Sequence, residues 1–149
     1  MIISFFGHSN FCENAEIKKR VMELLNMLSE NGDIKFYLGG YGGFDEFAYR
    51  CCKEFKSTHP ETEIIFVTPY ITEEYQRNRL VYVKEMYDSI IYPEIEDKPL
   101  RFAIVYRNRY IVENSDFIIA FVKYTSGGAY KAIRYAEKRG KAVENLTVR

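Results

Sequence analysis

Short β-prone segments alternate with helical segments along this chain, and this alternation limits the fold more than any other sequence feature. The runs Ile2–Phe6 and Phe117–Val122 consist largely of β-branched and aromatic residues. Between such runs, apolar residues recur at helical spacing, as at Ile17, Val21 and Leu25. Strands joined through helices form right-handed crossovers, which build a parallel sheet with helices on both faces. We therefore expect an α/β fold of three layers, α/β/α, with a mainly parallel sheet of five to six strands.

A length of 149 residues suits a single domain, and we expect one over residues 1–149. The segment 70–99 is charged, rich in tyrosine and only weakly periodic. We expect it to be a partly helical insertion, within which 89–93 could form a short strand. The other expected strands are 2–6, 34–38, 63–68, 117–122 and 142–146, and the expected helices are 17–28, 44–55, 100–113 and 129–140.

Composition and charge exclude several classes of protein. Hydrophobic residues make up 47% of the chain, which is enough for a conventional core and excludes intrinsic disorder as the main state. The 21 basic and 21 acidic residues balance, so a nucleic-acid partner is not expected. Three cysteines suit a reducing compartment, and no apolar run approaches the ~20 residues of a membrane span. We expect a cytoplasmic protein without a membrane partner, a metal or a cofactor.

Three strand-to-helix junctions carry small or polar residues: Gly7–Ser9, Gly39–Gly43 and Thr125–Gly128. In a parallel sheet these junctions meet at one edge, where unpaired N–H groups at helix N-termini bind phosphate. The sequence thus predicts binding of a nucleotide or a nucleotide-derived phosphorylated small molecule. Strand-to-helix turns also use glycine for steric reasons alone, and neither the P-loop nor the dinucleotide-binding fingerprint is present. The candidate ligand-binding residues are Gly7, His8, Ser9, Gly39, Gly40, Gly42, Gly43, Asp45, Arg107, Thr125, Ser126, Gly127 and Gly128.

Single charged residues have a structural interpretation beside the functional one. Asp45 could accept hydrogen bonds from a ribose or base, or it could simply stabilise the positive end of its helix. Glu46 points about 100° away from Asp45 around a helix, so we favour Asp45 as the ligand contact. Arg107 and Arg109 are two positions apart, so at most one faces the site, and we choose Arg107 to bind phosphate. His8 could contact phosphate, act as an acid or base, or only cap a turn.

The run Gly39-Gly40-Tyr41-Gly42-Gly43-Phe44-Asp45-Glu46-Phe47-Ala48 resembles the glycine-rich signature of the DprA/Smf branch of the SLOG superfamily. The stretch from Arg107 to Asp116, followed by an apolar strand and Gly127-Gly128-Ala129, is similar to the second half of small SLOG proteins, including the YpsA-like uncharacterised bacterial group. Gly7-His8 matches the end of the first strand there. This resemblance implies a Rossmann-like fold that binds nucleotides or their derivatives.

Another SLOG branch, the LOG phosphoribohydrolases, cleaves the N-glycosidic bond of nucleoside monophosphates. Leu38–Glu46 matches the spacing of its proline-glycine-glycine-x-glycine-threonine-x-x-glutamate motif, with Glu46 in the acidic position. The order of motifs instead assigns that role to the loop at Gly127-Gly128, where the position of the glutamate holds Arg134. An enzyme of this kind would depend on Asp45, Glu46 and Arg107 as catalytic residues.

One further function and the role of the tyrosine-rich segment 70–99 stay open at this point. A DprA-like accessory in single-stranded DNA processing is the third function considered, and the balanced charge argues against it. The five tyrosines of the 70–99 segment could form a lid over a base, although a homodimer interface is the more ordinary use of such a surface. These tyrosines are Tyr70, Tyr75, Tyr82, Tyr87 and Tyr92.

Overall fold

The computed structural model describes residues 1–147, which alternate between strands and helices as the sequence predicts. Expected and observed boundaries differ by one to three residues at most ends, because helices and strands fray or are capped there. The first helix, for example, begins after Asn14, whose side chain accepts a hydrogen bond from the Ile17 N–H at 2.9 Å. The strands are β1 (Ile2–Gly7), β2 (Lys35–Leu38), β3 (Glu63–Val67), β4 (Ser89–Ile91), β5 (Phe117–Phe121) and β6 (Ala142–Asn145). The helices are α1 (Ala15–Leu28), α2 (Gly43–Thr58), α3 (Glu73–Tyr75), α4 (Val81–Met86), α5 (Ala103–Asn114) and α6 (Gly128–Lys138).

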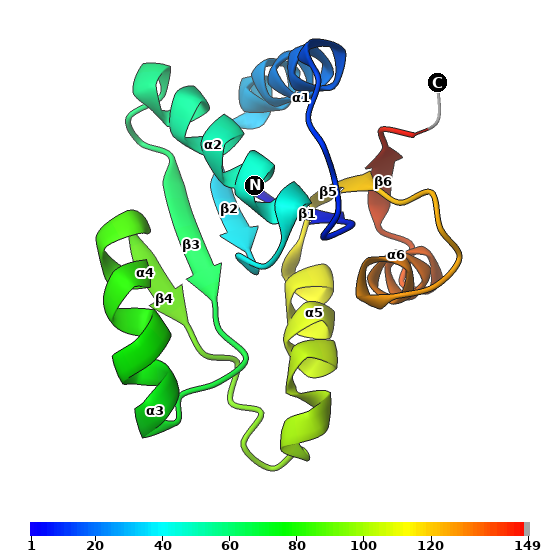
Figure 1. The fold of residues 1–149 in the computed structure, drawn as a ribbon. Helices are drawn as coiled ribbons and strands as arrows, with labels where there is room; N and C mark the ends of the chain where they lie inside the picture. The colour runs from blue at the N-terminus through cyan, green and yellow to red at the C-terminus, as the bar shows by residue number, and fades with distance from the viewer. Residues whose placement is uncertain (148–149) are drawn as a thin grey trace.

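The six strands form one sheet in the order β4-β3-β2-β1-β5-β6, and every neighbouring pair is parallel. Successive strands build outward from β1 to β4 on one side, after which the chain crosses back to place β5 on the other side of β1 (Figure 1). The direction of winding therefore reverses between β1 and β5. In open parallel sheets, ligands bind outside the carboxyl ends of the strands at such a reversal. The expected three-layer α/β fold is confirmed.

Each face of the sheet has its own hydrophobic core. Helices α1 and α2 cover one face, where Leu25, Phe36 and Phe55 are fully buried together. Helices α5 and α6 cover the opposite face, where Ile111 and Ala136 pack against the other side of the strands (Figure 1). Strand β5 is apolar throughout because it is covered by helices on both faces.

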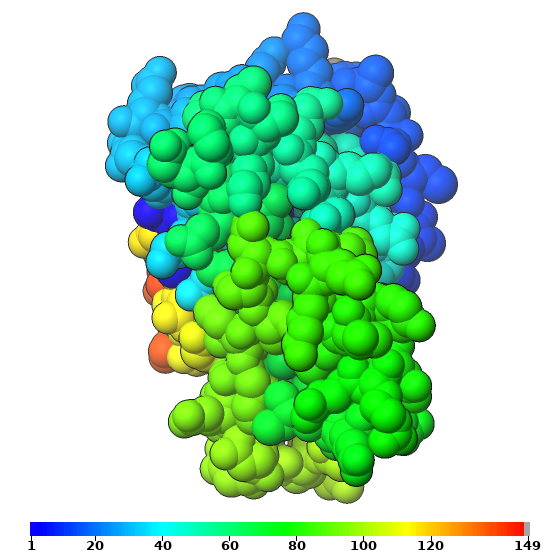
Figure 2. Space-filling model, turned by 90° about the vertical axis from the view of Figure 1, so that its left-hand side faces the viewer, coloured from blue at the N-terminus to red at the C-terminus, as the bar shows by residue number. Residues whose placement is uncertain are grey.

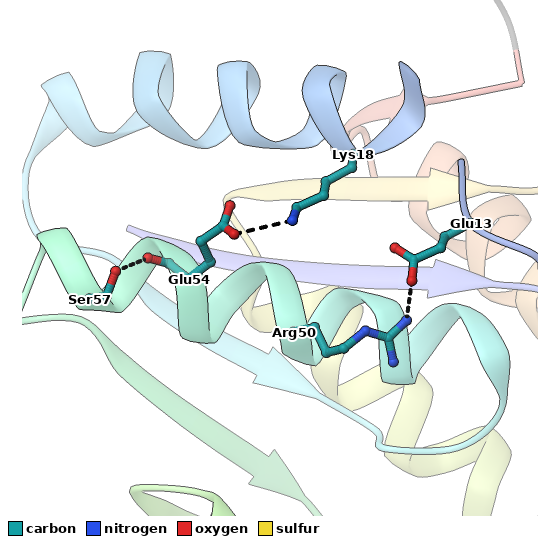
Figure 3. A network of polar contacts seen from close by, with 5 residues as sticks. All are labelled: Glu13, Lys18, Arg50, Glu54 and Ser57. Atoms are coloured by element: carbon teal, nitrogen blue, oxygen red, sulfur yellow. Dashed lines mark hydrogen bonds and ion pairs between the residues drawn. The ribbon is translucent and has the colours of Figure 1, made fainter. Parts of the chain in front are cut away.

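Polar contacts join α1 to α2 above their shared core. Lys18 of α1 pairs with Glu54 of α2 at 3.1 Å, and Arg50 of α2 pairs with Glu13, just before α1, at 3.0 Å (Figure 3). Ser57 also donates a hydrogen bond to the backbone carbonyl of Glu54. These side chains are half exposed, so the pairs contribute little to stability compared with the buried residues below them.

The segment 70–99 contributes to the sheet itself. Its helical part consists of α3, a π-helical turn at Gln76–Leu80 and α4, and its short strand β4 pairs with β3. Leu80 and Val83 bury their side chains in the same core as α1 and α2. Figure 2 views the molecule from this side, where the green atoms of the segment lie directly against the cyan-green atoms of α2. The segment expected as an insertion therefore completes a further strand–helix–strand unit.

None of the helices within residues 1–147 combines the length and the apolar character that crossing a lipid bilayer requires.

Candidate functional site

A cavity of about 440 Å³ opens outside the carboxyl ends of β1 and β5, where the winding of the sheet reverses. This volume lies within the ~300–1,000 Å³ range of small-molecule sites. Parts of all three glycine-bearing junctions reach it, although they are far apart in the sequence. The predicted site residues that line this cavity are Gly7, His8, Ser9, Gly39, Asp45, Arg107, Gly127 and Gly128.

The remaining predicted residues lie outside the cavity. Gly40 and Glu46 line a separate hollow next to α4, and Thr125 faces another hollow between β5 and α6. Ser126 is exposed and lines neither of these spaces. Gly42 and Gly43 lie beneath the loop that follows β1.

The glycines at the start of α2 have a steric role. The N–H groups of Gly43 and Phe44 donate to the backbone carbonyls of Ser9 and His8, at 2.8 and 3.3 Å. A Cβ on Gly42, whose φ is +90°, would stand 2.7 Å from the Cα of Ser9. The first turn of α2 therefore binds the loop after β1, and these two N–H groups are not available to a ligand.

The N-terminus of α6 is open to the cavity. Its first intrahelical hydrogen bond runs from the Lys131 N–H to the Gly127 carbonyl. The N–H groups of Gly128 and Ala129 therefore precede the hydrogen-bonded part of the helix and have no acceptor within residues 1–147. A Cβ on Gly127 or Gly128 would meet no atom of the described residues within 4 Å, so open space adjoins the start of the helix. Such a helix start attracts anions.

Arg107 brings a buried positive charge to the same cavity. Its side chain is 4% exposed, Nη1 donates to the carbonyls of Val67 at 2.9 Å and Gly39 at 3.3 Å, and Nε donates to Asn108 Oδ1 at 2.9 Å. Nη2 makes no hydrogen bond within residues 1–147. Every fully buried side-chain nitrogen in this part of the chain has a hydrogen-bond partner, so Nη2 itself is not fully buried. Because Arg107 lines the cavity, we infer that Nη2 is accessible from there. Arg109, two residues on, is exposed and does not line this cavity, as the helical spacing predicts.

Asp45 lies across the cavity on α2. Its Oδ2 accepts a hydrogen bond from the Tyr41 N–H at 2.8 Å, which closes the turn before the helix. Burial raises the pKa of Asp45 to about 6, even though this hydrogen bond and the positive charge of Arg107 both act to lower it. Burial likewise lowers the pKa of Arg107, against the opposing effect of Asp45. The cavity thus holds a guanidinium and a carboxyl that titrates near neutral pH.

His8 connects the loops after β1 and β5. Its Nε2 accepts hydrogen bonds from the N–H groups of Lys123 at 2.9 Å and Tyr124 at 3.3 Å, and its ring lies 4.6 Å from that of Tyr124. Burial and the nearby Lys123 charge lower the pKa of His8. These contacts require the neutral imidazole with its proton on Nδ1. His8 therefore holds the chain that leads to Gly127, and only Nδ1 remains for contact with a ligand.

Sequence reasoning missed several residues that line the cavity. Asn108 follows Arg107 directly, and its Nδ2 has no acceptor within residues 1–147. Tyr41 lies inside the glycine run, so its position could have indicated this role. Phe6, Asn10, Tyr124 and Ala129 directly flank the predicted junctions, so their positions could have indicated them as well. Nothing in the local sequence marks Phe5 and Ile104, because only the tertiary fold brings them to the sheet edge.

A fully parallel sheet that reverses between β1 and β5, with a cavity beyond that reversal, defines a Rossmann-like α/β protein. No protein-family model matches the chain. The fold is similar to two solved structures of DNA processing protein A (DprA), a protein of the SLOG group. The structure from Helicobacter pylori has a TM-score of 0.62 at 20% identity, and the one from Streptococcus pneumoniae has a TM-score of 0.63 at 17% identity. These comparisons confirm the expected likeness at the level of the fold.

The chain spans only part of these DprA structures. The match to the Helicobacter structure covers 98% of this chain and 66% of the Helicobacter chain. The match to the Streptococcus structure covers 95% of this chain and 48% of the Streptococcus chain. The Helicobacter structure was described for its unique mode of single-stranded DNA binding. In sequence, the chain is similar to YoqJ, an uncharacterised SPbeta prophage-derived protein of Bacillus subtilis strain 168, at 24% identity over 83% of this chain and 81% of YoqJ.

Proposed function

We propose that the cavity binds a nucleotide or a nucleotide-derived phosphorylated small molecule. The observation that carries this proposal is the meeting of two unsatisfied sets of donors in one space: the free N–H groups of Gly128 and Ala129, and Nη2 of the buried Arg107. Backbone N–H groups at a helix start together with a guanidinium are the donors that proteins use for phosphate. The fold places them at the edge where ligands of Rossmann-like proteins bind.

The rest of the cavity suits a nucleoside. Asp45 can accept a hydrogen bond from a ribose hydroxyl or from an amino group of a base, and Asn108 Nδ2 can donate one. Tyr41 and Tyr124 are 75% and 47% exposed at the rim, where their rings can lie against a base. The apolar lining by Ile104 adds contact area that a free phosphate ion would not use.

The test is a thermal-shift and calorimetric panel of nucleotides, nucleosides, ADP-ribose and NAD on the wild type and on Gly128→Pro. Proline fits the first position of a helix and removes one donor N–H, so helix α6 should persist while phosphate binding weakens. We expect a nucleoside monophosphate to bind more tightly than its nucleoside, and Gly128→Pro to lose about tenfold in affinity for it.

The matched control is Gly128→Ala, which keeps the N–H and places its Cβ in open space. Affinity that is equal in wild type and Gly128→Pro, or the absence of any hit at millimolar concentration, would contradict the proposal.

A single-stranded DNA partner is the second candidate, and the described activity of the Helicobacter DprA favours it. The sequence argument against nucleic acid rests on net charge alone, whereas local basic surface can suffice for a single strand. Fluorescence anisotropy with a labelled twelve-residue single strand at low and moderate salt tests it. Tight binding that falls steeply with salt would support this function over the small-molecule one.

Cleavage of an N-glycosidic bond is the third candidate, favoured by a carboxyl with a raised pKa in the cavity. Asp45 is placed to stabilise an oxocarbenium ion or to transfer a proton, whereas Glu46 is exposed and faces the hollow beside α4. Chromatography of nucleoside monophosphates incubated with the protein would detect released base. Release by wild type and not by Asp45→Asn would establish this activity.

A further inference from the structure

A second hollow adjoins the cavity, between α5 and α6. Its volume is about 350 Å³, and it shares three wall residues with the cavity: Ile104, Asn108 and Gly128. Gly128 has no side chain, and a Cβ there would meet no atom of the described residues within 4 Å. The two spaces therefore meet at a wall that carries only the side chains of Ile104 and Asn108. We call the second one the α5/α6 groove.

The groove carries a concentrated positive charge. Among the described residues, four cations line it, namely Arg109, Lys131, Arg134 and Lys138, and no aspartate or glutamate does. The three that belong to α6 are spaced three and four residues apart and so form one stripe along the helix. Because the whole chain has zero net charge, this stripe is a local excess and not part of a general basic surface.

Few of these charges are neutralised within the protein. Lys131 and Lys138 make no ion pair in the described part of the chain, residues 1–147. Arg134 approaches Glu137 at 4.0 Å with both side chains 56% exposed, a separation at which the pair is weak. Arg109 lies over the rings of Tyr106 and Tyr135, which leaves its charge uncompensated. The groove thus offers free cations to an anionic group.

We propose that the ligand has two nucleotide units joined through phosphate, one unit in the cavity and the second in the α5/α6 groove. The inference rests on the proposed function, because the first phosphate is placed at Gly128 and Arg107. The second phosphate, which joins the two units, lies against Lys131 and Lys138. Asn108 Nδ2 stands at the shared wall, where it donates to the same phosphate, and Tyr130 lines the groove beside the second unit.

The experiment is calorimetry with AMP and with the 5′-phosphorylated diadenylate pApA on the wild type and on the double variant Lys131→Met/Lys138→Met. We expect the wild type to bind pApA at least about tenfold more tightly than AMP, because two further charge-assisted contacts form. In the double variant this advantage should fall to about twofold or less, with the affinity for AMP unchanged, since neither lysine lines the cavity. The variant Lys53→Met/Lys84→Met, which loses the same charge from exposed positions elsewhere, should keep the full advantage.

The outcomes separate this inference from the proposed function. If AMP binds and Gly128→Pro weakens it, but pApA binds no more tightly or keeps its advantage in Lys131→Met/Lys138→Met, the groove is not a subsite and only the cavity stands. If the affinity keeps rising from pApA to a twelve-residue strand, a bounded two-unit ligand is wrong and an open nucleic-acid track replaces it. If neither AMP nor pApA binds, the two-unit ligand is wrong, and the proposed function falls with it only if no other nucleotide of the panel binds.

Discussion

Arg107 is the residue on which the cavity most depends. It is buried, and its guanidinium connects the ends of β2 and β3 by donating to the carbonyls of Gly39 and Val67. These hydrogen-bond acceptors stabilise the buried charge, and the nearby Asp45 acts to raise the pKa of Arg107 against the effect of burial. The same geometry leaves Nη2 facing the cavity, so one side chain both holds the loop and offers a donor to a ligand.

Replacing Arg107 by methionine should therefore act on both stability and Asp45. We expect the free energy of unfolding to fall by about 2–4 kcal/mol at neutral pH, because the carbonyls of Gly39 and Val67 lose their buried donor. The pKa of Asp45 should rise further above 6, since the Arg107 charge acts to lower it. Urea denaturation and carboxyl NMR titration measure the two effects. Arg109→Met, at an exposed position of the same helix, should change neither; an unaltered Asp45 pKa in Arg107→Met would show that the two groups do not interact.

Asp45 should make stability depend on pH in a defined direction. Its folded pKa of about 6 lies above the ordinary value of 3.8, so the folded state binds this proton more tightly than the unfolded state does. The contribution of this group to the free energy of unfolding is greatest below pH 4 and falls as the pH rises from about 4 to 6. Above pH 6 the free energy of unfolding is lower by about 3 kcal/mol than below pH 4.

The variant Asp45→Asn removes this titration and resembles the protonated carboxyl. We expect it to be about 3 kcal/mol more stable than wild type at pH 7 and about equal at pH 4, as measured by denaturant unfolding at both values. A difference that is the same at the two pH values would mean that the pKa of Asp45 is not raised in the fold.

At the scale of elements, the N-termini of α2 and α6 have opposite roles although both begin with a glycine pair. The first turn of α2 donates to the loop after β1, and Gly42 is needed because a Cβ would collide with Ser9. The N–H groups of Gly128 and Ala129 at the start of α6 have no acceptor within residues 1–147, and open space adjoins them. One glycine loop thus builds the site and the other is free to bind.

Alanine substitutions should separate these two roles. Gly42→Ala places a Cβ 2.7 Å from backbone at a φ of +90°, so we expect a loss of roughly 2–4 kcal/mol in the free energy of unfolding. Gly128→Ala adds its Cβ in open space within a helix and should leave stability unchanged or slightly higher. Chemical denaturation of both variants tests this, and equal effects would show that the loop after β1 does not contact α2 closely.

At the scale of the molecule, the two cores share one sheet. The strands that bury Phe36 and Ile119 toward α1 and α2 bury their alternate residues toward α5 and α6. Neither pair of helices can unfold without exposing to water the apolar face of the strands that it covers. The α1–α2 ion pairs in Figure 3 lie outside these cores and add little.

We therefore expect the chain to unfold in a single cooperative transition. Far-UV circular dichroism, which reports helices, and near-UV signals from the tyrosines should give the same urea midpoint. An early loss of helix signal while tyrosine packing persists would mean that the α1–α2 layer, which holds one tyrosine, unfolds before the α5–α6 layer, which holds four.

Much of the fold could be predicted because helical and strand periodicities are local properties. The apolar spacing from Ile17 to Leu28 and the continuous apolar run from Phe117 indicate a helix and a strand without reference to the rest of the chain. The segment 70–99 was the weakest prediction, because its short helices and three-residue strand leave too few repeats to show a period. Its place as the strand beside β3 depends on burial of Leu80 and Val83, which only the packing shows.

The candidate site divides in the same way. By itself, the sequence determined that three glycine-bearing junctions follow strands, that a parallel sheet brings such junctions to one edge, and that Arg107 and Arg109 point to different sides of a helix. Only the tertiary structure decided which donors are free. Gly43 and Phe44 donate to the carbonyls of Ser9 and His8, more than 30 residues away in the chain, whereas Gly128 and Ala129 find no such acceptor within residues 1–147. The physical reason is that a backbone N–H finds an acceptor only where another segment lies next to it in space, and the local residue types do not show which segment that is.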